Sequence, residues 1–300
     1  MWLVWILNSL ILVIIVLLGV AIFTGVERKI LSSMQRRNGP NLLGYYGLLQ
    51  AISDGLKLIF KGFSLPEGSD RFLFILGPLV SFGVGFGLWG LFPFGVKSLV
   101  WSQVGLVLVL GLSSISIHGV LLGGYSSNSK YAYYGGVRSS AQMISYEVSL
   151  AFILGSVVLL EGGSFGLNYF GYGSSYWLLI GGFPLFILWL ISILSETNRH
   201  PFDLPEAESE LVSGYNVEYS GGSFALYFLG EYSSILFMSY LSALLFGEKS
   251  FMVFVFITLF FVWARGAWPR VRYDQLMSLG WSSILPLSLG FLFLVIALIV

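Results

Sequence analysis

Eight apolar stretches, most of them about twenty residues long, constrain the fold of this chain more than any other feature. A helix needs roughly 20 apolar residues to cross about 30 Å of hydrocarbon, because it satisfies its own backbone groups and rises about 1.5 Å per residue. We therefore predict an all-α membrane protein, a polytopic bundle of eight transmembrane helices in one domain, residues 1–300. The expected spans are 2–25, 72–94, 99–122, 141–160, 176–194, 223–246, 251–268 and 281–300, the seventh being interrupted by Arg265.

The low charge content supports the bilayer as the solvent of this chain. It is 56% hydrophobic and 10% charged, with 15 basic and 15 acidic residues, whereas an ordinary soluble domain has about 25% charged residues. The zero net charge also argues against nucleic-acid binding, which requires an excess of Lys and Arg. With no Cys and only two His, we expect no metal site, haem or iron–sulfur cluster in this chain.

Basic residues are distributed unevenly among the connections between the expected spans. All of them except Lys97 and Lys249 fall in the odd-numbered connections or, in the case of Arg265, at the end of the seventh span beside one. By the positive-inside rule, these connections face the bacterial cytoplasm or the mitochondrial matrix, and both termini lie on the opposite side. The even number of spans and the charge bias therefore predict the same topology.

A second helical pattern follows the first span. Apolar residues recur at helical spacing, and polar residues occupy the opposite face. The apolar positions are Leu48, Ile52, Leu56, Ile59, Phe60 and Phe63, and the polar positions are Gln50, Asp54, Lys57 and Lys61. This pattern predicts an amphipathic helix that lies in the membrane interface.

Two glutamates fall inside expected spans, Glu147 in the fourth and Glu231 in the sixth. An ionised group at such depth costs at least about 2.5 kcal/mol, so these residues usually face protein or water and mark a pathway. Both spans start on the positively charged side, which places the two carboxyl groups at similar depth and allows them to share a polar cavity. In the alternative interpretation, each is a neutral, hydrogen-bonded carboxyl group that only fixes helix packing.

The fifth connection, residues 195–222, is acidic where the charge bias predicts a basic segment. It holds a single basic residue, Arg199. Its six acids are Glu196, Asp203, Glu206, Glu208, Glu210 and Glu218. We expect these carboxyl groups to titrate together and to lie within reach for proton exchange. The alternative is a solvated acidic loop, but interleaved residues such as Phe202 and Tyr215 favour a loop packed against other parts of the protein.

Longer motifs in three odd-numbered connections carry a resemblance to a known family. They are residues 27–29 (ERK), 35–41 (QRRNGPN), 46–50 (YGLLQ) and 54–57 (DGLK), then 195–204 (SETNRHPFDL) and 206–219 (EAESELVSGYNVEY), then 265 and 269–277 (PRVRYDQLM). Over nearly its whole length, the chain resembles the NADH-ubiquinone oxidoreductase chain 1 family, the proximal membrane subunit of respiratory complex I.

The resemblance implies a subunit that forms much of the ubiquinone access tunnel and joins the membrane arm to the soluble redox arm. The residues that match tunnel positions of the family are Arg28, Arg37 and Asp54. The acids that match its proposed proton path are Glu147, Glu196, Glu206, Glu208, Glu210 and Glu231. Two positions depart from the family pattern, because Ala207 stands where Gly is usual and Asn38 replaces a frequent basic residue.

The resemblance also implies an enzyme complex that couples ubiquinone reduction to proton translocation in the mitochondrial inner membrane. Ubiquinone would be the substrate, while NADH, FMN and the iron–sulfur clusters would belong to partner subunits. The expected partners are the other membrane and peripheral subunits of complex I, ubiquinone and the lipid bilayer. Two alternatives stay open, a membrane subunit of a related hydrogenase complex and a proton-coupled transporter, which predicts inverted repeats. A bacterial plasma membrane satisfies the same charge bias.

Overall fold

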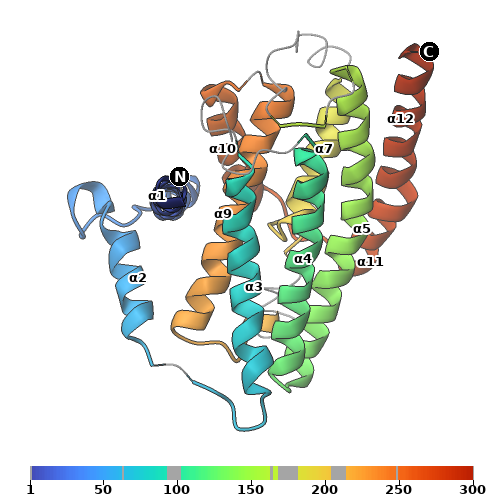
Figure 1. Ribbon diagram of the computed structural model, residues 1–300. Coiled ribbons are helices and arrows are strands. Elements are labelled where there is room, and N and C mark those ends of the chain that lie inside the picture. The colour runs from blue at the N-terminus through green and yellow to red at the C-terminus, as the bar shows by residue number, and fades with distance from the viewer. Residues whose placement is uncertain are drawn as a thin grey trace.

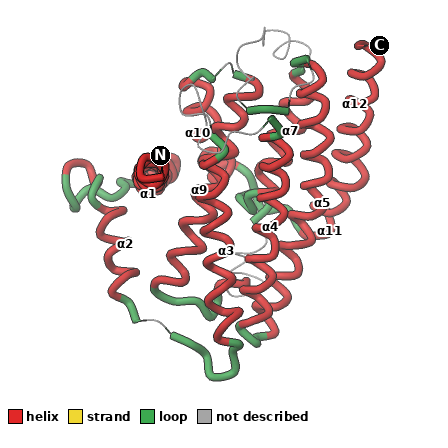
Figure 2. Tube along the Cα trace, viewed as in Figure 1, coloured by secondary structure: helices red, strands yellow, loops and turns green. Residues whose placement is uncertain are grey.

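The computed structural model of the chain describes residues 2–62, 64–92, 103–162, 165–167, 182–203, 214–247 and 249–299. Within these ranges, all regular secondary structure is helical, and loops join the helices (Figure 2). The prediction of an all-α fold is confirmed for this part of the chain.

Six helical segments are long and apolar enough to cross a membrane. They are α1 (Trp2–Met34), α3 (Arg71–Gly90), α4 (Gly105–Ser126), α5 (Lys130–Leu160), α9 (Gly222–Phe246) and the continuous run of α11 (Tyr273–Ser278), the π-helical turn η3 (Leu279–Ile284) and α12 (Leu285–Ile299). The expected fifth and seventh spans correspond to two shorter apolar helices, α7 (Phe183–Glu196) and α10 (Phe251–Ala267). The structure thus supports a polytopic membrane protein, while the count of eight spans stays a prediction.

Several helices extend beyond the apolar runs that predicted them. α5 begins at Lys130 rather than at residue 141, and α1 continues to Met34 rather than ending near residue 25. The physical reason is that an α-helix requires only its backbone hydrogen bonds, so polar residues beyond the bilayer prolong it. At the start of α5, the side chain of Ser129 accepts a hydrogen bond from the Ala132 N–H and caps the helix.

The helices α3, α4, α5 and α9 pack side by side, with α12 on the far side of α5 (Figure 1). Small residues allow these close approaches. An added Cβ at Gly85 of α3 would lie 2.8 Å from the carbonyl oxygen of Gly230 in α9, so this crossing depends on the absence of a side chain. The result is a tightly packed bundle whose interior holds the polar residues described below.

α1 is oriented differently from the rest of the bundle. Figure 1 looks nearly along its axis, whereas α3, α4, α5 and α9 run up the page. α2 (Gln50–Phe60) follows α1, and its apolar side chains Ile52, Leu56, Ile59 and Phe60 are exposed. A helix therefore forms where the amphipathic pattern predicts one, and its location in a membrane interface stays a prediction.

Candidate functional site

A cavity of about 60 Å³ lies between α3, α4, α5, α9 and the end of α7. One water molecule needs roughly 10–15 Å³ of such space, so the cavity has room for several. Hydroxyl, amide and carboxyl groups form its polar lining. They belong to Ser81, Ser113, Ser116, Glu196, Thr197, Asn198, Tyr215, Tyr227, Glu231 and Ser234. The cavity therefore combines space for water with two titratable carboxyl groups.

Glu196, the last residue of α7, is one of the two acids at this cavity. Its side chain is buried, with 4% exposed, and neither carboxyl oxygen has a hydrogen-bond partner in the part of the chain that the structure describes. Buried polar groups normally have partners, so the exception points to a function. A carboxyl group that holds its proton accounts for this burial, because a neutral acid costs much less to bury than a charged one.

Burial raises the pKa of Glu196 to about 8, and the nearby negative charge of Glu147 acts in the same direction. Glu196 follows the apolar part of α7 and lies two positions beyond residue 194, where the expected fifth span ends. At neutral pH the carboxyl group therefore mostly holds its proton. Because the pKa is close to 7, a modest change in local charge is enough to release it.

Glu231 of α9 is the second acid at the cavity. The Tyr215 hydroxyl, from the short helix η2 (Gly214–Asn216), donates a hydrogen bond to Glu231 Oε1 at 2.5 Å. Glu147 of α5 is half-buried and is not among the described residues that line the cavity, although its charge acts on Glu196. The structure thus joins Glu231 with Glu196, whereas the sequence analysis considered a cavity shared with Glu147.

Gln142 of α5 holds the end of α7 in place. Its side-chain Nε2 donates two hydrogen bonds of 2.9 Å, to the carbonyl oxygens of Ser195 and Phe202, and its side chain is fully buried. These bonds fix the backbone on both sides of Glu196 relative to α5. This role of Gln142 was not predicted, although a glutamine inside an expected apolar span was a signal for it.

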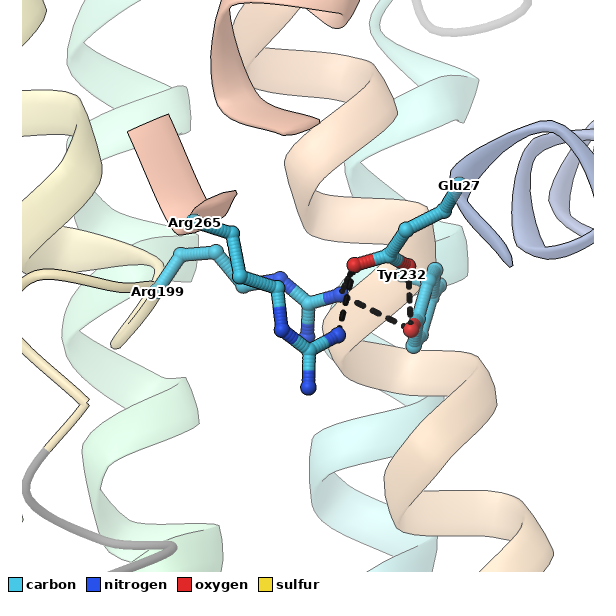
Figure 3. Close-up of polar contacts among 4 residues, drawn as sticks. All are labelled: Glu27, Arg199, Tyr232 and Arg265. Atoms are coloured by element: carbon cyan, nitrogen blue, oxygen red, sulfur yellow. Dashed lines mark hydrogen bonds and ion pairs between the residues drawn. The ribbon is translucent and has the colours of Figure 1, made fainter. Parts of the chain in front are cut away.

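A second buried carboxyl group lies near the end of α1 (Figure 3). Glu27 Oε1 forms ion pairs with Arg199 Nη2 at 2.5 Å and with Arg265 Nη1 at 2.6 Å. The Tyr232 hydroxyl donates to Glu27 Oε2 at 2.6 Å and accepts from Arg199 Nη2 at 2.8 Å. We call these four residues the Glu27 cluster.

The Glu27 cluster connects four parts of the fold, since its members come from α1, the segment after α7, α9 and α10 (Figure 3). Glu27 is 3% exposed and Arg199 is 6% exposed. Removing one partner from such a buried pair costs about 3–5 kcal/mol, so the cluster is expected to hold the inclined α1 against the bundle. The pairing of Glu27 with Arg199 was not predicted from the sequence, although Arg199 stands out as the single base of the acidic connection.

Two of the three expected tunnel residues form a contact. Arg28 Nη1 and Asp54 Oδ2 are 2.5 Å apart, and Gln50 Nε2 donates to Asp54 Oδ1 at 3.0 Å. The Arg28 and Asp54 side chains are 52% and 35% exposed, so this pair bridges α1 and α2 at the surface. Arg37 is exposed and donates from Nε to Gln35 Oε1 at 2.8 Å, separate from that pair.

The acidic connection is described only in part. Glu206, Glu208 and Glu210 lie outside the described residues. Before this gap, Asp203 is buried, and its carbonyl oxygen accepts a hydrogen bond from Arg270. After the gap, Tyr215 is also buried. The described ends of the connection are therefore packed into the protein, as the interleaved aromatic residues indicated.

Comparisons with known proteins identify the family of this chain. A family model for NADH dehydrogenase matches residues 7–296. The chain is 46% identical to NADH-ubiquinone oxidoreductase chain 1 of Patiria pectinifera, over 99% of this chain and 95% of that protein. It is 47% identical to the protein of the same name from Aedes aegypti, over 95% of this chain and 93% of that one. It is also 45% identical to an NADH-quinone oxidoreductase subunit of Paramagnetospirillum magneticum, over 93% of this chain and 87% of that protein. The chain therefore belongs to the NADH dehydrogenase family.

Proposed function

We propose that this chain is a membrane subunit of a proton-translocating NADH-quinone oxidoreductase and that it exchanges protons with a nearby quinone site through buried carboxyl groups. Family membership supports the first part of the proposal. The second part is carried by one observation. Glu196 is buried, has no hydrogen-bond partner for its carboxyl group among the described residues, and lies at a cavity that it shares with Glu231.

The chemistry follows from the charge balance of quinone reduction. A quinone that receives two electrons also takes up two protons to form the quinol, so the charge around its site changes during turnover. Glu196 has a pKa of about 8 and therefore responds to small changes in local potential. Uptake of a proton at the quinone site would be followed by proton release from Glu196, with water in the cavity and Glu231 as the next acceptors. In the same way Glu147, through its charge, would affect when Glu196 releases its proton.

The quinone itself would approach along α1, α2 and α9, which contact one another. The Arg28–Asp54 pair and Arg37 supply polar groups in this part of the chain, together with the exposed apolar residues of α2. In this proposal NADH, FMN and the iron–sulfur clusters belong to partner subunits. The location is the mitochondrial inner membrane, with both termini on the intermembrane-space side, and a bacterial plasma membrane is the alternative.

The test is Glu196→Gln in the assembled complex, inserted in sealed vesicles. The amide has almost the same shape as the acid but cannot release a proton, so proton translocation should fall by about a hundred-fold or more. Translocation is followed with a pH-sensitive dye in the vesicles, and native gel electrophoresis checks that the complex is assembled.

Glu67→Gln is the matched control, because Glu67 is an exposed acid in the connection between α2 and α3. It should translocate protons at the normal rate. Glu231→Gln should reduce translocation as Glu196→Gln does. Normal translocation in Glu196→Gln would contradict the proposal that this cavity carries protons.

A further inference from the structure

Three buried hydroxyl groups form a column that the proposed proton path does not use. The Tyr219 hydroxyl lies 3.2 Å from the Ser126 hydroxyl, and the Tyr227 hydroxyl adjoins it beside the Gly123 backbone. Tyr219, Tyr227 and Ser126 are 5%, 1% and 1% exposed, respectively. A series of adjoining hydroxyl groups inside a protein is a route along which protons can move, because each group both donates and accepts a hydrogen bond.

The packing around the column leaves space for these hydroxyl groups. An added Cβ at Gly77 would lie 2.5 Å from the Tyr227 hydroxyl oxygen, and one at Gly123 would overlap the same atom. The ring of Tyr219 stacks on Phe74, with centroids 4.0 Å apart, and meets the ring of Tyr227 edge-on at 5.1 Å. The missing side chains of α3 and α4 thus form the pocket in which the phenol groups meet.

The two ends of the column lie in different environments. Tyr227 lines the cavity that holds Glu196 and Glu231, so one end meets the acids. Ser126 is the last residue of α4, and its carbonyl oxygen accepts a hydrogen bond from the backbone N–H of the exposed Asp70. At this end of the bundle α3 begins at Arg71 and α5 begins at Lys130, as Figure 1 shows at the bottom of the view.

At rest, each phenol hydroxyl also contacts helix carbonyl groups. Tyr227 donates to the Gly119 carbonyl at 3.0 Å, and Tyr219 lies within 3.3 Å of the Phe74 carbonyl and 3.4 Å of the Gly123 carbonyl. Burial raises the pKa of the Tyr219 phenol. The phenol therefore stays neutral and can pass a proton on only by exchange, with its own hydrogen rotating between the carbonyl acceptors and the next hydroxyl.

We propose that the Ser126–Tyr219–Tyr227 column carries protons between the Arg71–Lys130 end of the bundle and the Glu196–Glu231 cavity. In each transfer a hydroxyl oxygen accepts one proton and releases its own, and water in the cavity receives the last one. After the hydrogens rotate back, every phenol and alcohol has its original complement of one proton, and no electron moves. This inference rests on the proposed function of the cavity and supplies it with protons from the Arg71–Lys130 end of the bundle rather than from the other carboxyl groups of the acidic connection.

Tyr219→Phe is the direct test, because it removes the central hydroxyl and keeps the ring that stacks on Phe74. In the assembled complex in sealed vesicles, steady-state proton translocation should fall by about ten-fold, less than for loss of a carboxyl group, because water partly replaces the hydroxyl. Tyr227→Phe should have a similar effect, and the double variant should be no slower than the slower single variant, since both hydroxyls serve one route.

Tyr240→Phe is the matched control. Tyr240 also belongs to α9, and its ring packs edge-on against Phe92 with centroids 4.0 Å apart, away from the column. This variant should translocate protons normally. A purely structural role of the hydroxyls would lower the thermal stability of Tyr219→Phe and leave its translocation unchanged, and that result would overturn the inference.

The Glu196→Gln complex separates this inference from the proposed function. If Glu196→Gln stops translocation and Tyr219→Phe does not slow it, the carboxyl path stands and the hydroxyl route is wrong. If Glu196→Gln translocates protons normally, the proposed function of the cavity is contradicted, and the inference that rests on it is contradicted too. If both variants are impaired, both proposals are supported.

Discussion

Glu27 and Glu196 are buried to the same extent, yet the protein surrounds them in opposite ways. Glu27 is 3% exposed and Glu196 is 4% exposed. Two arginines and a tyrosine occupy the oxygens of Glu27, whereas the oxygens of Glu196 have no partner in the described part of the chain. The difference shows that two equally buried acids can have opposite electrostatic surroundings. A paired carboxylate holds helices together, whereas a carboxyl group without such partners can exchange its proton.

Glu27→Gln should have the largest effect on stability. It leaves Arg199 and Arg265 without this counter-charge, and the loss of one partner in a buried pair costs about 3–5 kcal/mol. Thermal unfolding of the assembled complex, compared with the exposed-site variant Glu67→Gln, measures this cost. A Glu27→Gln complex as stable as the control would show that the Glu27 cluster does not hold α1 in place.

Gln142→Leu should have the second-largest effect on stability. It removes the two hydrogen bonds that Gln142 donates to the Ser195 and Phe202 carbonyl groups at the end of α7. The free energy of unfolding should fall by about 2–3 kcal/mol. The same thermal measurement applies, with Gln275→Leu at an exposed position of α11 as the control. Equal stability of the two variants would mean that Glu196 keeps its position without Gln142.

Glu196→Gln should change stability by no more than about 1 kcal/mol near pH 5, where the carboxyl group is neutral in the folded protein and still partly protonated in the unfolded chain. Its effect depends on pH. The folded state keeps a proton that the unfolded chain releases, so the wild-type protein loses stability as the pH rises from about 4.5 to about 8.

Melting temperatures of the wild-type and Glu196→Gln complexes between pH 5 and about 8.5 should therefore converge at the acidic end. As the pH rises, the melting temperature of the wild type should fall relative to that of the variant. Parallel curves across this range would show that Glu196 is ionised like an ordinary surface acid, and the contrast with Glu27 would then disappear.

Arg28→Ala should have the smallest effect. The Arg28–Asp54 pair is exposed, and exposed pairs contribute about 1 kcal/mol or less, which salt weakens further. The difference from wild type should vanish in high salt, and Arg36→Ala, at an exposed position just after α1, should show no change. A loss of several kcal/mol in the free energy of unfolding would show that Arg28 contributes as much to stability as the buried charges of the Glu27 cluster.

The helices were largely predictable from the sequence, and their ends were not. Apolar runs identify the segments that become α1, α3, α4, α5, α9 and α12, because hydrophobic length is a local property. The polar residues that extend α5 back to Lys130 have no hydrophobic signal, since a helix outside hydrocarbon needs only its backbone bonds. Glu231 was likewise predictable from its depth in an apolar span, but its neighbour at the cavity is Glu196 rather than the expected Glu147.

The sequence by itself determined that this chain belongs in a membrane, which end of the bundle carries the basic residues, and to which family it is related. These properties depend on composition, on the order of charged and apolar segments, and on motifs that stand together in the chain. Only the tertiary structure decided that Glu27 meets Arg199 and Arg265, that Glu196 has no such partner among the described residues, and that Tyr219 reaches Tyr227 and Ser126. The physical reason is that partners from distant segments meet only through the packing of helices, so their identity is not written in any local pattern.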